Sequence, residues 1–137
     1  MATLPSGLPE IVADGEDLAR FLTSSGHLSA VIAKPSAFLP NVKDRETSVF
    51  RHGPEPRSSL WAIGLSVVAG GDRSLKGAAI LKARHVREAE LEVRASEPPP
   101  KHAAIVGWPW LDDPELQKAQ QKERAALLAQ QSELLRV

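Results

Sequence analysis

Short stretches of alternating or β-branched residues predict several strands. Leu91-Glu92-Val93-Arg94-Ala95 alternates strictly between apolar and polar side chains, which is the pattern of a half-buried strand. Residues 47–51 (TSVFR) combine β-branched and aromatic side chains, which favour strands. Residues 75–81 and 102–106 are short apolar runs next to polar residues or glycine. These segments together predict a small sheet.

Apolar residues spaced three or four positions apart predict helices in the first half of the chain. Leu18, Phe21 and Leu22 have this spacing, so we expect a helix over 15–25. Asp14 is a suitable N-cap for it. The same spacing predicts a second helix over 56–69, and residues 83–90 predict one or two further turns.

The helix predicted over 56–69 contains a glycine, Gly64. A third helix, the longest, is predicted at the end of the chain. Gly64 costs helix stability relative to alanine, and close packing against a neighbour would explain its position. Asp113 is a good N-cap and Pro114 fits the first helical turn. The residues that follow are rich in Ala, Leu, Gln, Glu and Lys, which favour a helix over 113–135.

These elements predict an α+β fold. We expect residues 1–12 to form an irregular arm and residues 13–137 to form a single α+β domain. Its sheet should be small, mixed or antiparallel, with three to five short strands. Helices 15–25 and 56–69 should pack on the sheet, and helix 113–135 should lie across the outside.

Composition and charge narrow the class of function. The chain has no cysteine and carries 17 basic and 17 acidic side chains. Thiolate chemistry and cysteine-bound zinc are therefore excluded, and the basic excess typical of nucleic-acid binders is missing. No apolar run approaches the length of a membrane span, and residues 1–10 lack the pattern of a signal peptide. We expect a cytoplasmic protein that binds no membrane.

Two histidines are candidates for catalysis. His52 lies in the segment Arg51-His52-Gly53-Pro54, just after a predicted strand, where functional residues often occur. Arg51 could bind a phosphate or carboxylate, and His52 could transfer a proton. Alternatively, the segment is a solvated turn in which Arg51 pairs with Glu46 or Glu55.

His102 follows three consecutive prolines at 98–100. A stiff segment can hold a side chain in one place, so that His102 could act as a general base. Alternatively, residues 97–110 are a rigid strap that closes the core. The histidine spacings match no metal motif, so we expect no metal and no cofactor.

Two further groups of side chains could bind partners. The basic residues between 73 and 94 include Arg84, which could bind an anion, although a mixed solvated surface fits better because glutamates lie among them. Tryptophans after the prolines and leucines of the last helix could contact another protein. These candidate partner-binding residues are Trp108, Trp110, Leu127, Leu128, Leu134 and Leu135.

Two segments carry a resemblance. SVFRHGPEPRSSLWAIG (48–64) and EPPPKHAAIVGWP (97–109) resemble motifs in a loose group of short bacterial proteins with no established activity. The resemblance covers about residues 20–136 and implies no reaction and no fold. The positions to which it draws attention are Arg51, Trp61, His102, Gly107, Trp108 and Pro109.

Three functions remain open at this stage. The first is a non-enzymatic interaction module, an accessory or adaptor subunit of a bacterial complex in a mobile-element or defence setting, with an unidentified protein partner. The second is a small hydrolase or phosphodiesterase that acts on an anionic substrate with Arg51 and either His52 or His102. The third is a weak nucleic-acid binder that uses the basic middle of the chain.

Overall fold

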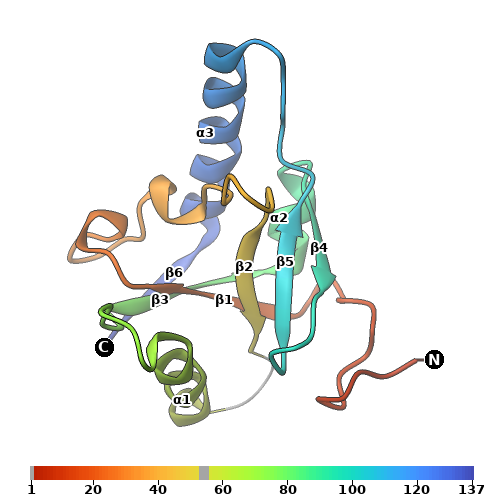
Figure 1. Ribbon diagram of the computed structural model, residues 1–137, viewed down its shortest axis with the longest axis vertical. Helices are drawn as coiled ribbons and strands as arrows, with labels where there is room; N and C mark the ends of the chain where they lie inside the picture. Colours follow the sequence, from red (N-terminus) through yellow and green to blue (C-terminus); the bar gives the residue numbers. More distant parts are fainter. Residues whose placement is uncertain (1, 53–55) are drawn as a thin grey trace.

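The computed structural model describes residues 2–52 and 56–137 of the chain (Figure 1). It is an α+β fold with six strands and three α-helices in the described residues. Two short 3-10 helices, η1 and η2, lie between β1 and β2. The elements in chain order are β1 (Asp17–Leu22), η1 (Ser25–His27), η2 (Pro35–Phe38), β2 (Thr47–Arg51), α1 (Arg57–Val68), β3 (Gly77–Lys82), α2 (Ala83–Glu88), β4 (Glu92–Ala95), β5 (His102–Val106), α3 (Pro114–Gln131) and β6 (Glu133–Arg136).

All six strands belong to one antiparallel sheet with the order β4-β5-β2-β1-β3-β6. The expected α+β class is therefore confirmed, and the expected number of three to five strands is too low. The segments predicted as strands at 47–51, 91–95 and 102–106 are β2, β4 and β5. The segment predicted at 75–81 is β3.

The helix predicted over 15–25 is wrong, because this segment contains strand β1. Leu18 and Leu22 pack into the core on one face of the sheet, and Ala19 and Phe21 pack into the core on the other face. A strand buried on both faces does not show the alternation of a half-buried strand. Its apolar residues then match helical spacing by coincidence.

The helix predicted over 113–135 is also too long. Helix α3 ends at Gln131, and Ser132 is its C-cap. The next residues turn back as β6 and pair with β3, with Gly77 opposite Arg136. A Cβ atom at Gly77 would lie 2.6 Å from the backbone oxygen of Leu135. Glycine at this position therefore allows the last strand to approach.

Helices cover both faces of the sheet. Helix α1 packs Leu60 against Phe21 and Phe50 on one face, while η2, α2 and α3 contribute to the core on the other. A Cβ atom at Gly64 would lie 2.8 Å from Cε1 of Phe21. The close packing expected at Gly64 is thus confirmed, and it holds α1 against the sheet.

The sheet bends sharply in its middle. Strands β1 and β2 pair at only two positions, Leu18 with Arg51 and Ala19 with Phe50. Figure 1 shows β2, β4 and β5 crossing β1, β3 and β6 at a steep angle. The bend creates a corner beside β2, and this corner contains the candidate site.

None of the helices in residues 2–52 and 56–137 combines the length and apolar character needed to cross a membrane.

Candidate functional site

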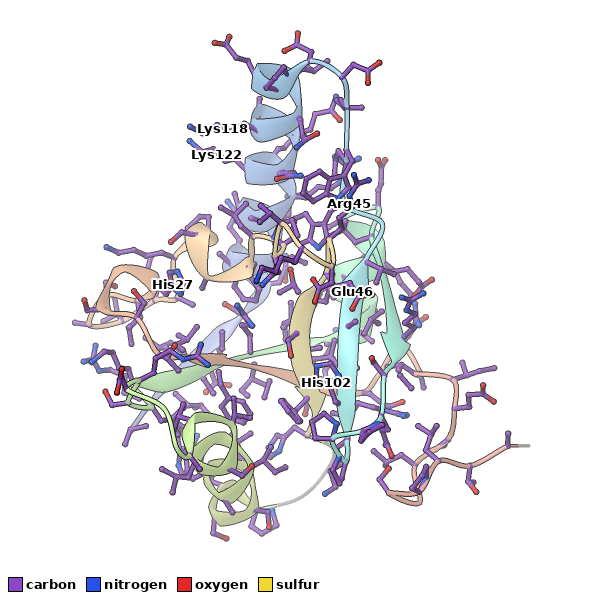
Figure 2. The ribbon with its side chains drawn as sticks, viewed as in Figure 1. His27, Arg45, Glu46, His102, Lys118 and Lys122 are labelled. Carbon is purple, nitrogen blue, oxygen red and sulfur yellow. The ribbon has the colours of Figure 1, made fainter. Side chains whose placement is uncertain are left out.

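A polar pocket of about 430 Å³ lies in the corner where β1 separates from β2. Figure 2 labels His27, Glu46 and His102, which lie around this corner and come from η1, the segment before β2, and β5. The residues that line the pocket are Arg20, Phe21, Thr23, His27, Leu39, Asn41, Asp44, Glu46, Ser48, Phe50, Val67, Arg73 and His102.

A serine and a histidine meet at the wall of this pocket. Oγ of Ser48 lies 2.5 Å from Nε2 of His102. The other ring nitrogen, Nδ1, lies 2.8 Å from the carbonyl oxygen of Ser96. A carbonyl oxygen can only accept, so Nδ1 carries the proton and donates it to Ser96. Nε2 of the neutral ring is then free to accept the hydroxyl proton of Ser48.

The sheet brings these two side chains together. In the β2–β5 register, Phe50 lies opposite His102 and Ser48 lies opposite Ala104. Alternate residues of a strand share a face, so Ser48 and Phe50 point to the same side. The rings of Phe50 and His102 meet edge to face at a centroid distance of 5.2 Å. This contact restricts the rotation of the imidazole.

Arg20 closes the gap between the separating strands. Its Nε donates to the carbonyl of Ala37 and its Nη1 donates to the carbonyl of Ser48, both at 2.9 Å. Burial lowers the pKa of Arg20, and the positive charge of Arg73 lowers it further. Two guanidinium groups therefore face the same pocket and repel each other.

His27 adds a third group to this side of the pocket. Its pKa is lowered by burial and by the positive charge of Arg20. The exposed side chain of Arg73 completes the set. The lowered pKa favours the neutral form of His27, which can still hydrogen-bond a ligand. A bound anion would relieve the repulsion between Arg20 and Arg73, so this side of the pocket is suited to a phosphate or carboxylate.

Two acidic residues also line the pocket and offset part of this positive charge. Glu46 lies 2.7 Å from Nη2 of Arg94, outside the pocket lining, and this pair neutralises it. Asp44 is exposed, and its Oδ1 accepts the backbone N–H of Glu46 at 3.0 Å. Over the part of the chain that the structure describes, no group of three or more histidine, aspartate or glutamate residues is placed to hold a metal ion.

Arg51 lies on the opposite face of the sheet from His102. Its side chain is 1 % exposed, and its Nε and Nη2 donate to the two carboxylate oxygens of Glu16 at 2.8 Å. Nη1 donates to the carbonyl of Pro9 at 2.6 Å. Of the two expected partners, Glu46 pairs with Arg94 instead, and Glu55 lies outside the described residues. Arg51 is thus a structural cation, and the structure does not bring it together with His102.

His52 and Arg84 also lie away from the pocket. His52 is half-buried, and its backbone N–H donates to the carbonyl of Asp17 at 2.9 Å. Arg84 is exposed on α2. Gly53 and Pro54, which belong to the same candidate segment as His52, lie outside the described residues. Of the predicted site residues that the structure describes, His102 alone lines the pocket.

The six candidate partner-binding residues do not form one surface. Trp108 and Leu128 are buried in the core, and Trp110 is half-buried beneath the guanidinium of Arg45, 4.7 Å from the ring centroid. Leu134 and Leu135 lie in β6 and pack on opposite faces of the sheet. The side chain of Leu127 remains exposed at 43 %.

Ion pairs neutralise part of the basic middle of the chain. Lys82 pairs with Asp17 at 3.0 Å. Arg87 contacts both Asp14 and Glu92. These pairs reduce the positive charge available to a nucleic acid.

Sequence reasoning missed most of this site. Ser48, Arg20, Arg73 and His27 come from four separate segments, and no motif links them. The period of two in strand 47–51 does place Ser48 on the face of Phe50. Only the pairing of β2 with β5 brings His102 to that face.

Comparison with known proteins finds no matching family model, no matching curated protein and no matching solved structure.

Proposed function

We propose that this protein is a small serine hydrolase that cleaves esters of anionic compounds. Ser48 is the nucleophile and His102 is the general base. The observation that carries the proposal is the pair of contacts of His102, 2.5 Å from Nε2 to Ser48 and 2.8 Å from Nδ1 to Ser96. A nucleophile, a base and a group that orients the base form the arrangement used in nucleophilic catalysis.

The reaction follows from these contacts. Nε2 of His102 takes the hydroxyl proton while Oγ of Ser48 attacks the ester carbonyl. The tetrahedral intermediate collapses to an acyl-serine, and the imidazolium returns the proton to the departing alkoxide. Water then attacks the acyl-serine with His102 again as base, which releases the acid and restores the hydroxyl of Ser48.

The remaining pocket residues support an anionic substrate. Ser96 accepts a hydrogen bond from Nδ1, which holds the imidazole in the reactive tautomer and stabilises the imidazolium. Arg20 and Arg73 provide positive potential in the same pocket. This potential attracts an anionic group and stabilises negative charge that develops during the attack.

An active-site label tests the proposal. A fluorophosphonate should modify the protein once, at Ser48, as measured by intact mass and peptide mapping. Ser48→Ala should abolish the label, and Ser36→Ala should retain it, because Ser36 is exposed outside the pocket lining. Labelling that survives Ser48→Ala, or no labelling of the wild-type protein, would refute the proposal.

A second candidate function is the interaction module. Leu116 and Leu127 on α3 are 49 % and 43 % exposed. They are eleven residues apart, or about three helical turns, and so lie on one face. The exposed first half of α3 extends away from the sheet in Figure 1. Leu116→Glu should abolish association with a partner protein that copurifies with the wild type, and unchanged association would exclude this surface.

A further inference from the structure

A second hollow adjoins the pocket on the side of α1. It measures about 350 Å³ and lies between that helix and the proline segment. Its lining is apolar except for Ser66, whose hydroxyl donates to the carbonyl of Ile63 at 2.6 Å. The lining residues are Phe50, Ala62, Ile63, Ser66, Val67, Pro99 and Pro100.

This apolar hollow adjoins the pocket that contains Ser48 and His102. Phe50 and Val67 line both cavities. The ring of Phe50 also contacts the imidazole of His102 at a centroid distance of 5.2 Å. The hollow is therefore the apolar space next to the reacting atoms.

We infer that the substrate is an ester of a medium-length fatty acid with an alcohol that carries a phosphate or carboxylate. This inference rests on the proposed hydrolase function. The acyl chain occupies the apolar hollow, and the anionic alcohol faces Arg20 and Arg73. A water molecule occupies about 30 Å³ in the liquid, and a methylene group is of similar size. The volume of about 350 Å³ therefore holds roughly twelve such groups, so an octanoyl chain fits.

The polarity of the two cavities decides which half of the substrate goes where. A charged group in the apolar hollow would lose its hydration without gaining a partner, which is costly. A hydrocarbon chain beside Arg20 and Arg73 would displace water from charged groups. The acyl and anionic halves of one ester therefore have one favourable orientation.

A chain-length series tests the acyl half. The probes are the p-nitrophenyl esters of acetate, butyrate, octanoate and hexadecanoate, whose leaving group is the same throughout. We expect kcat/KM to rise at least tenfold from acetate to octanoate, because each buried methylene contributes up to about fourfold. Hexadecanoate should gain nothing in proportion to its added methylenes, because its chain exceeds the hollow.

Variants on α1 test whether the acyl chain binds in the apolar hollow. Ala62→Trp fills it from an exposed position, and should lower the ratio of kcat/KM for octanoate to kcat/KM for acetate at least tenfold. Ile63→Glu should act in the same direction. Leu65→Glu is the matched control, because Leu65 lies on the same helix, is 58 % exposed and does not line the hollow. Thermal unfolding of each variant establishes that it is folded.

The outcomes separate the two proposals. No ester turnover that depends on Ser48 would overturn the hydrolase function itself. Turnover that depends on Ser48 but is equal for acetate and octanoate would overturn only the acyl assignment. An octanoate preference that survives Ala62→Trp would also overturn it.

Discussion

Oγ of Ser48 and Nε2 of His102 lie 2.5 Å apart, although 54 residues separate the two in the chain. Neighbouring antiparallel strands bring them together, and the edge of Phe50 against the imidazole keeps them there. Both residues lie on strands rather than on loops. Strands hold catalytic side chains in a more precise geometry than loops do.

The first prediction concerns the coupling of these two residues. Ser48→Ala and His102→Ala should each lower kcat for p-nitrophenyl acetate by about 10²- to 10⁴-fold. The double variant should lose no more than the worse single variant, because residues that act as a unit are not additive. Steady-state kinetics of the three proteins measure this, and multiplicative losses would contradict a shared step.

The second prediction concerns anion binding by Arg73. Inorganic phosphate should inhibit ester hydrolysis competitively. Arg73→Gln should weaken this inhibition about tenfold, because a hydrogen bond to a charged group contributes about 1.5–3 kcal/mol. Arg57→Gln is the control, since Arg57 is equally exposed but lies outside the pocket lining. Equal inhibition constants for the two variants would exclude Arg73 from the anion site.

The third prediction concerns the pH dependence of stability at His27. Burial and the charge of Arg20 lower its pKa below the ordinary value of 6.5. The unfolded chain then binds a proton near pH 6.5 while the folded protein does not, so this residue makes the free energy of unfolding fall as the pH drops below 6.5. Urea unfolding from about pH 7.5 to pH 5 should show a smaller fall for His27→Gln. Parallel curves would show that His27 is not desolvated.

The fourth prediction concerns the buried pair of Glu16 and Arg51. Burial alone would raise the pKa of Glu16, but hydrogen bonds from Arg51 and from the backbone of Ala13, with the charge of Arg51, lower it below 4.5. The stabilisation is complete above pH 4.5 and is lost as the pH falls through the folded-state pKa.

Glu16→Gln should therefore destabilise the protein by about 3 kcal/mol at neutral pH, because it leaves a buried guanidinium without its counter-ion. The matched control is Glu92→Gln, which removes an exposed partner of Arg87 and should cost less than about 1 kcal/mol. Chemical denaturation measures both values. Similar losses in the free energy of unfolding would show that the pair of Glu16 and Arg51 stabilises the protein no more than an exposed ion pair does.

The fifth prediction concerns the packing of α1. Gly64→Ala adds a methyl group that would lie 2.8 Å from Phe21 and 2.9 Å from Leu75. Overpacking costs about 1–3 kcal/mol and outweighs the gain in helix propensity of about 1 kcal/mol. The melting temperature should therefore fall. Gly71→Ala, where a Cβ meets only a backbone oxygen at 3.6 Å, should leave it nearly unchanged.

Local patterns were reliable where burial is one-sided or where a cap is explicit. Strand β4 alternates because one face is exposed, and α3 begins at the expected Pro114 because Asp113 caps it with two hydrogen bonds. They failed at β1, where both faces are buried and the alternation disappears. They failed again after Gln131, where residues that favour a helix instead pair with β3 as strand β6.

The sequence by itself determined the class of fold and the positions of α1, β2, β4 and β5. It also singled out His102, which lines the pocket. The class and the positions depend on interactions between residues close together in the chain, such as capping and side-chain periodicity. Only the tertiary structure decided that Arg51 is buried against Glu16 and that Ser48 and Arg20 join His102 in one pocket. Strand order and the bend between β1 and β2 bring those residues together, and such long-range pairing leaves no periodic signal in the sequence.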